Sequence, residues 1–259
     1  MAAIERITSR SNPLVGRLRR LAQDNTGYRG AGEVWLEGEH LCTAARAHAR
    51  PVRLAVLDDA AAADATLRAL ADDAPRVVTL PGALFASISR LESPGRIGFV
   101  SPLPERTDID ANAASVVIDR VQDAGNVGSI LRSAAAFGVR QVLALGGSAA
   151  LWSPKVLRAG MGAHFALRLV EGLDEAALDR LALPIVATSP HATLALDRTP
   201  IPRPCAWVFG HEGQGLSASL LARCALALRI PQPGGEESLN VAAAAAVCLY
   251  ESARGADAQ

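Results

Sequence analysis

The chain has 259 residues, half of them hydrophobic and a fifth charged, so it can bury a substantial core and is too apolar to be disordered. Charged residues, proline or glycine interrupt every apolar run before it reaches membrane-spanning length, and the N-terminus lacks the apolar segment of a signal peptide. Four cysteines are scattered singly, which indicates neither a zinc site nor a disulfide framework. We therefore expect a cytoplasmic protein of bacterial type with no membrane partner.

The formal net charge is zero, but the charges are unevenly distributed along the chain. Residues 1–30 carry six arginines and two acidic residues, whereas residues 31–110 carry eight basic and twelve acidic residues. A basic N-terminal arm on a neutral protein fits contacts with the phosphates of a nucleic acid. The solvated end of an amphipathic helix explains the same charges equally well.

The first hundred residues predict a small α/β domain. Ser11-Asn12-Pro13 supplies a cap and a first-turn proline for a helix that runs to about Ala22. After a turn-rich break, β-rich runs alternate with Ala/Leu-rich helical stretches. The predicted strands are Glu33–Leu36, Val52–Leu57, Val77–Leu80 and Ile97–Val100. A linker follows at Ser101–Asn112, so we divide the chain into a basic helical arm (1–30), a substrate-binding domain (31–105) and a larger domain (106–259).

The second half repeats this rhythm more strongly. Apolar strands that alternate with helices predict a parallel sheet with both faces covered. The predicted strands are Ser115–Ile118, Gln141–Leu145, Ile185–Thr188, Ala206–Phe209 and Leu226–Ile230, and the predicted helices are Val127–Phe137, Pro154–Met161, Asp174–Leu181 and Ser217–Ala222. Ligands of such sheets gather at the carboxyl ends of the strands. Three loops there are rich in glycine, asparagine and acidic residues: Asp119–Gly128, Gly210–Gly215 and Pro231–Asn240.

The third of these loops leads directly into an alanine-rich helix. Two prolines and two glycines keep the loop out of regular structure, and Ser238 is a good N-cap residue. The helix predicted from Leu239 to about Ser252 is apolar nearly all round, which is typical of a buried helix. A polar loop on a rigid helix supports a ligand site, and an ordinary strand–loop–helix crossover explains the same stretch.

Other familiar site patterns are missing. No Gly-x-Gly-x-x-Gly follows the first strand of either half, and no Walker A lysine is present. A Gly-x-Ser-x-Gly elbow is also absent. We interpret the isolated His164, His191 and His211 as surface or packing residues, and we predict no metal site.

The three loops together resemble the three motifs of the SpoU (TrmH-type) branch of the SPOUT RNA methyltransferases. The first motif is similar to Asp119–Arg132, the second to Phe209–Leu216 and the third to Ile230–Val241. The segment Lys155–Ala163 resembles the stretch between the motifs, with Gly160 where a serine is common in the family. The likeness spans about residues 113–253, and the first hundred residues are similar to the family's small substrate-binding domain.

This resemblance implies a knotted fold and a cofactor. The family's C-terminal portion threads through a loop to form a trefoil knot, an exception to the rule against knots. The expected fold is therefore a small N-terminal α/β substrate-binding domain plus a C-terminal knotted parallel-sheet α/β SPOUT domain. S-adenosyl-L-methionine is expected to sit bent in the knot's turns, with its adenine and ribose near Thr188, Gly210, Ile230 and Leu239.

The resemblance also implies methyl transfer to a ribose 2′-hydroxyl of ribosomal RNA, with transfer RNA as second choice. Arg132 matches the family position often described as the base, but a guanidinium holds its proton far above neutral pH. We therefore expect Arg132 to stabilise the developing 2′-oxyanion or an adjacent phosphate. Asn126 is expected to cap its helix and orient Arg132 or the ribose. Glu212 would hold Asn126, a backbone turn or Arg132, while Ser238 and Asn240 would bind the substrate or the methionine moiety.

A homodimer through the C-terminal domain is expected as well. One sheet face buries only one stripe of an all-apolar helix, and the first-motif helix has small residues at 133–136. In the resembling family these two helices form the dimer contact, and Arg132 can reach the partner's cofactor pocket. Two alternatives stay open: a catalytically inactive RNA-binding or ribosome-assembly protein, and a methyltransferase that acts on a nucleobase.

Overall fold

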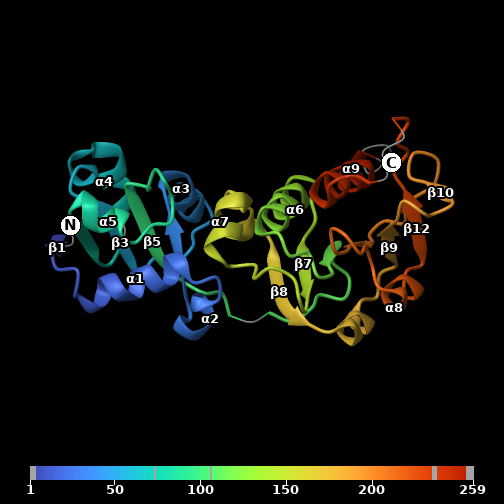
Figure 1. Ribbon diagram of the computed structural model, residues 1–259, viewed down its shortest axis with the longest axis horizontal. Coiled ribbons are helices and arrows are strands. Elements are labelled where there is room, and N and C mark those ends of the chain that lie inside the picture. The colour runs from blue at the N-terminus through green and yellow to red at the C-terminus, as the bar shows by residue number, and fades with distance from the viewer. Residues whose placement is uncertain (1–3, 73, 106, 235–237, 255–259) are drawn as a thin grey trace. The chain divides into compact units, whose positions relative to one another are not determined.

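The computed structural model describes residues 4–72, 74–105, 107–234 and 238–254. The chain folds into two compact units, which Figure 1 shows from blue at the N-terminus to red at the C-terminus. Unit 1 consists of residues 1–105 and 152–165, and unit 2 consists of residues 106–151 and 166–259. Each unit has its own sheet and its own core.

Unit 1 contains a mixed five-stranded sheet in the order β1-β4-β3-β5-β2. Strands β1, β4 and β3 are parallel to one another, whereas β5 is antiparallel to both β3 and β2. The strands are β1 (Ile4–Arg6), β2 (Glu33–Glu37), β3 (Leu54–Asp58), β4 (Val77–Leu80) and β5 (Ile97–Pro102).

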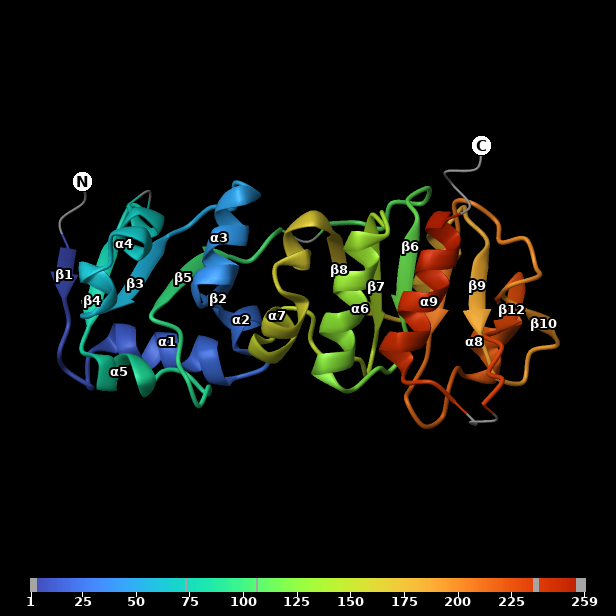
Figure 2. The ribbon, with the colours of Figure 1, turned by 90° about the horizontal axis from the view of Figure 1, so that it is seen from above.

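Helices cover both faces of this sheet, with α1 and α5 on one face and α3 and α4 on the other (Figure 2). The helices are α1 (Pro13–Gln23), α2 (Gly27–Ala31), α3 (Glu39–Ala47), α4 (Ala65–Ala71), α5 (Gly82–Ala86) and α7 (Pro154–Gly160), with the short 3-10 turns η1 (Ala61–Ala63) and η2 (Ala163–Ala166). Helix α1 begins as predicted, because the Asn12 side chain accepts a hydrogen bond from the Leu14 amide at 2.9 Å. Its buried face includes Leu14, Leu18 and Leu21.

Unit 2 contains a seven-stranded sheet in the order β10-β12-β9-β11-β6-β7-β8, and every neighbouring pair is parallel. The predicted parallel α/β sheet is thereby confirmed. The strands are β6 (Ser115–Ile118), β7 (Gln141–Leu145), β8 (Arg168–Leu173), β9 (Ile185–Thr188), β10 (Leu194–Ala195), β11 (Ala206–Phe209) and β12 (Leu226–Arg229).

Helices α6 (Ala124–Ala136) and α9 (Val241–Arg254) lie side by side on one face of this sheet (Figure 1). The Trp207 indole on β11 donates a hydrogen bond to the Ser252 hydroxyl at 2.8 Å, which joins the sheet to α9. On the other face, η3 (Glu175–Arg180) and α8 (Ala218–Ala222) contribute Leu178 and Leu220 to the core. The interior strands β6, β7, β9 and β11 are thus buried between two helical layers.

Several local predictions were wrong. Helix α9 begins after Asn240, whose side-chain oxygen accepts hydrogen bonds from the Ala242 and Ala243 amides, so the cap is Asn240 and not Ser238. Helix α6 is capped by Asp123, which accepts from the Asn126 amide, so Asn126 is not the cap. The helix predicted at Asp174–Leu181 is the 3-10 helix η3. Strands β1, β8 and β10 were not predicted.

Within the described part of the chain, no helix is long and apolar enough to cross a membrane. All four cysteines are free thiols, and burial raises the pKa of Cys205 and of Cys224 to about 11. At neutral pH these two thiols are therefore protonated and poorly suited to nucleophilic chemistry or metal binding.

Candidate functional site

A cavity opens at the carboxyl ends of the neighbouring strands β12, β9 and β11. Its volume is about 330 Å³, and it lies wholly within unit 2. Pockets of this size at strand ends are the usual ligand sites of parallel sheets. The lining residues come from three loops and the start of α9, and they include Thr188, His191, Gly210, Glu212, Leu216, Leu221, Ile230, Gln232, Ser238, Leu239 and Val241.

The loop after β11 is a tight turn held by His211. The His211 Nδ1 accepts hydrogen bonds from the Gly213 amide at 2.9 Å and the Gln214 amide at 3.2 Å. The backbone of His211 also pairs with that of Gly215. Gly210 lies so close to this turn that an added Cβ would stand 2.5 Å from the Gly215 carbonyl carbon. His211, which we interpreted as a surface or packing residue, therefore shapes the cavity wall.

A hydrogen-bonded chain of three side chains joins the three motif loops. Glu212 accepts a hydrogen bond from the Asn126 side-chain amide at 3.2 Å. Asn126 in turn accepts one from the Asn240 side-chain amide at 3.0 Å. Asn240 also caps α9, so the chain of contacts runs from the loop after β11, through α6, to the start of α9. We call Glu212, Asn126 and Asn240 the motif triad.

Glu212 also holds the backbone of the first loop. Its carboxylate accepts from the Asp123 amide at 3.1 Å and the Gln122 amide at 3.3 Å. Partial burial alone would raise the pKa of Glu212, but the hydrogen bonds from its own amide, the Asn126 side chain and these two amides outweigh burial and lower it. The carboxylate therefore stays ionised at neutral pH and acts as an acceptor.

We expect Glu212→Gln to destabilise the fold at neutral pH, because an amide presents only one acceptor oxygen to the Asn126 side chain and the Asp123 and Gln122 amides. A depressed pKa means that the stabilisation by Glu212 is present above the unfolded-state pKa, about 4.3, and is lost as pH falls through the lower folded-state value. Urea unfolding at pH 7 and at pH 3 measures this: the gap between wild type and variant should shrink at pH 3. A gap of equal size at both pH values, or no gap larger than that of the exposed control Glu92→Gln, would refute the role.

Arg120 is a structural residue of the site that the sequence analysis missed. Its backbone is left-handed with φ of 53°, a strained conformation for a residue other than glycine. Its guanidinium forms an ion pair with the buried Asp119 at 2.9 Å and donates to the Gln214 side chain and the Gly215 carbonyl. Arg120 thus ties the first loop to the second. The positive φ gives no signal in the sequence, because arginine is not a typical residue for it.

Arg132 lies apart from the cavity. It is exposed on α6, it is not among the described residues that line the cavity, and no hydrogen bond or ion pair joins it to another described residue. Arg132 lies six residues after Asn126 on the same helix, so its side chain points well away from the face that carries Asn126. The predicted contact of Glu212 with Arg132 is therefore absent among the described residues, whereas its predicted contacts with Asn126 and a backbone turn are present.

The other predicted residues converge. The cavity at the strand ends is lined by the residues that we expected around the cofactor: Thr188, Gly210, Ile230 and Leu239. Ser238 and Glu212 line it too, and Glu212 connects it to Asn126 and Asn240. No group of three His, Cys, Asp or Glu side chains gathers as a metal site would within the described residues.

The protein is thus a parallel α/β protein whose ligand cavity lies at the strand ends, walled by the loops after β9, β11 and β12. The particular family follows from comparison. The SpoU rRNA methylase family matches residues 113–250, just over half of the chain, and the protein belongs to that family. This confirms the resemblance inferred from the three motifs and places the protein among the RNA methyltransferases.

Two of the similar proteins extend over both units of the chain. An uncharacterised tRNA/rRNA methyltransferase of Synechocystis is 34% identical over 269 residues, which cover 97% of this chain and 94% of the relative. The 23S rRNA (guanosine(2553)-2′-O)-methyltransferase RlmP of Bacillus subtilis is 33% identical over 169 residues, 64% of this chain and 68% of its own. The SpoU methyltransferase AviRb of Streptomyces viridochromogenes, solved with AdoMet, is 26% identical with a TM-score of 0.85 and covers 95% of this chain and 98% of its own.

Proposed function

We propose that this protein transfers a methyl group from S-adenosyl-L-methionine to a ribose 2′-hydroxyl of 23S ribosomal RNA. The observation that carries the proposal is the motif triad, which joins the three family motifs beside one cavity. The name of RlmP supports ribosomal RNA as the substrate and the ribose 2′-hydroxyl as the methylated group. The complex of AviRb with AdoMet supports S-adenosyl-L-methionine as the cofactor. Transfer RNA is the second choice, as the name of the Synechocystis relative allows either. Ribosomal RNA as substrate implies a cytoplasmic location.

The lining of the cavity suits the chemistry of the cofactor. Apolar side chains of Leu216, Ile230 and Leu239 offer contacts to an adenine ring. The Gln232 Oε1 in the same wall is buried and has no hydrogen-bond partner among the described residues, so it can accept from an amino or hydroxyl group of a ligand. When bound, S-adenosylmethionine supplies a methyl group that its sulfonium already makes electrophilic, so the protein's main task is positioning.

The proposed roles follow from the contacts. Glu212 holds the first loop and Asn126 in place, and Asn240 links Asn126 to the start of α9, so all three are positioning residues. Ser238 is exposed at the cavity and offers a hydroxyl to the methionine moiety or the substrate. We assign Arg132 to the developing 2′-oxyanion, because a guanidinium donates without giving up its proton. Residues 31–105 are proposed as the RNA-binding domain, preceded by the basic arm.

Transfer of a radioactive methyl group tests the function. Purified protein, labelled S-adenosylmethionine and a 23S rRNA transcript should yield a 2′-O-methyl nucleoside after complete digestion to nucleosides. A label found on a nucleobase would favour the base-methylating alternative. Binding of the transcript and of the cofactor without any transfer would favour the inactive RNA-binding protein.

We expect cofactor binding to need no metal ion, because the cavity combines apolar walls with backbone and amide groups. Calorimetry with S-adenosylmethionine should give the same dissociation constant, within about twofold, with and without EDTA. Omitting RNA from the titration keeps the magnesium requirement of RNA folding out of the result. Loss of binding in EDTA that magnesium restores would contradict this expectation.

The working unit is proposed to be a homodimer through unit 2. Arg132 lies outside the cavity of its own chain, so a second copy is the direct way to bring it to a cofactor. Helices α6 and α9 lie together, and Val247 and Tyr250 on α9 are 41% and 54% exposed, which leaves apolar surface for a partner. A two-fold pairing of like surfaces is the commonest oligomer geometry.

Complementation tests the dimer. Mixing an Arg132→Ala chain with a Gly210→Ala chain should restore activity at one of two composite sites, although each homodimer is inactive. Subunits must be exchanged by co-expression or refolding, and light scattering should give a dimer mass. A fully active monomer at micromolar concentration would end the proposal.

A further inference from the structure

Unit 1 carries a broad polar hollow along the exposed side of α1. Its volume is about 620 Å³, and it is lined by Gly16, Arg19, Arg20, Gln23, Asp24, Asn25 and Arg90. Three arginines and one carboxylate residue, Asp24, thus line this hollow. Among the described residues, neither Arg20 nor Arg90 has a carboxylate within ion-pair distance, and both are exposed. This balance favours a polyanion over a neutral or cationic ligand.

One arginine of this hollow, Arg19, is held in place by hydrogen bonds. The Arg19 guanidinium donates to the Ser87 carbonyl at 3.2 Å and to its hydroxyl at 3.1 Å, which leaves further N–H donors free. Gln23 donates to the Ser87 and Ile88 carbonyls, so α1 and the loop that carries Arg90 are joined. The Asp24 carboxylate is engaged by the amide and hydroxyl of Thr26.

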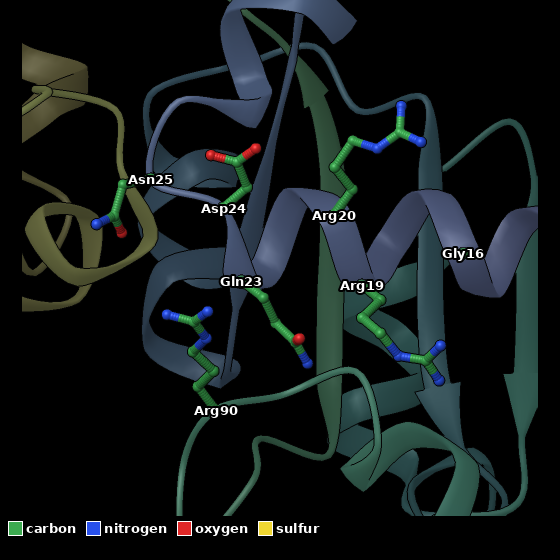
Figure 3. A pocket seen from close by; sticks show the side chains of 7 residues that line it. All are labelled: Gly16, Arg19, Arg20, Gln23, Asp24, Asn25 and Arg90. Atoms are coloured by element: carbon green, nitrogen blue, oxygen red, sulfur yellow. The ribbon is translucent and has the colours of Figure 1, made fainter.

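Gly16 is a helix-interior glycine without a packing reason. A Cβ added at Gly16 would meet no atom within 4 Å, so the fold does not require glycine here. Glycine is the least favourable helix-interior residue after proline, and one accepted reason for it is close approach of a ligand to the backbone. Figure 3 shows Arg19 and Arg20 leaving α1 on opposite sides, with Gly16 one turn earlier on the helix.

A second hollow continues the same surface. It is lined by Pro13, Gly16, Arg17, Arg20, Leu21, Ala31 and Glu33, so Gly16 and Arg20 border both hollows. Arg17 and Arg53 are both paired with Glu33, so two guanidinium groups meet one carboxylate there, and the surface beside the second hollow is also net positive. The two hollows therefore adjoin at Gly16 and Arg20 on α1.

We propose that the RNA sugar-phosphate backbone docks across α1 at Gly16, held by Arg19, Arg20 and Arg90. This rests on the proposed function and adds the surface through which unit 1 holds its substrate. Arginine forks suit phosphate oxygens, and the glycine lets the backbone strand lie close against the helix. Such contacts position the RNA and carry no sequence information of their own.

Binding of a 23S rRNA transcript to the full chain, measured at several salt concentrations, tests this surface. The double variant Arg20→Gln with Arg90→Gln should weaken binding at least about fivefold and flatten the plot of log affinity against log salt by about one unit per lost contact. Arg68→Gln removes one charge from α4 on the other face of the sheet and should leave both unchanged. A loss per removed charge as large in the Arg68 control would reduce the effect to net charge and overturn the proposal.

Gly16→Ala distinguishes an effect on RNA docking from an effect on folding. This change should raise the thermal midpoint of unfolding, because alanine favours the helix and meets open space. It should weaken RNA binding several-fold nonetheless, while S-adenosylmethionine binding is unchanged. Gly82→Ala, at an equally open helical position outside both hollows, should leave RNA binding unaltered. If the Gly16→Ala variant binds RNA as tightly as the wild type, docking at α1 is refuted, even if the wild-type enzyme methylates RNA. If the wild-type enzyme neither binds nor methylates RNA, the proposed function itself is refuted.

Discussion

Arg132→Ala is expected to lower the rate of methyl transfer at least about a hundredfold, the scale seen when one transition-state donor is removed. S-adenosylmethionine binding should change by no more than a few-fold, because Arg132 does not line the cavity of its own chain. The helix itself should be unaffected, since the side chain is exposed and alanine favours helix. Single-turnover methylation with labelled cofactor, beside calorimetry for binding, separates the two effects.

Two further variants sharpen this result. Arg132→Lys should rescue transfer poorly, because a point charge does not reproduce the planar fork of a guanidinium. Arg140→Ala removes an exposed arginine from the same unit, outside the cavity, and should retain wild-type transfer. Near-wild-type turnover in Arg132→Ala, or an equal loss in the Arg140 control, would remove Arg132 from the catalytic assignment.

Gly210→Ala is expected to abolish measurable S-adenosylmethionine binding, or to weaken it at least about tenfold. The added Cβ would stand 2.5 to 2.7 Å from backbone atoms of Gly215 and Leu216, which no side-chain rotation can relieve. The second loop must then open, with a cost of about 1–3 kcal/mol in folding free energy, typical of overpacking. Calorimetry and urea unfolding measure the two consequences.

The same loop offers a matched control. A Cβ at Gly213 would meet only the His211 ring, at an ordinary 3.8 Å, so Gly213→Ala should bind the cofactor nearly as wild type does. If both variants lose cofactor binding equally, a general perturbation of the loop explains the loss, and the close approach at Gly210 does not. If Gly210→Ala binds normally, the cavity is not where the cofactor sits.

The interior strands could be predicted from sequence because they are continuous apolar runs. Strands β6, β7, β9 and β11 have the bounds that the pattern indicated. The three strands that were missed, β1, β8 and β10, all lie at sheet edges. Strand β8 shows why: its sequence, Arg-Leu-Val-Glu-Gly-Leu, carries charges and a left-handed Gly172, as an edge exposed to water permits. The edge strand β2 was found because it is buried throughout.

Part of the site could be predicted because parallel strands end at one edge. Thr188 ends β9, Gly210 follows β11 and Ile230 follows β12, and the three residues line the same cavity. The motif triad gives no periodic signal, because its members are 86 and 114 residues apart in the chain. The resemblance to the family motifs, and not any periodic pattern, assigned these three residues to one site. Ser238 and Asn240 are both good cap residues, and only the fold decides between them. The trefoil knot and the domain limits stay predictions.

Mapping of 2′-O-methyl groups at nucleotide resolution in total RNA tests the central claim most directly. A strain that lacks the gene should lose a 2′-O-methyl group in 23S ribosomal RNA, and the wild-type gene should restore it. The Arg132→Ala gene should not restore it, although the variant protein still binds the cofactor. An unchanged 23S map, with or without a methyl group lost from a nucleobase or from transfer RNA, would contradict the account.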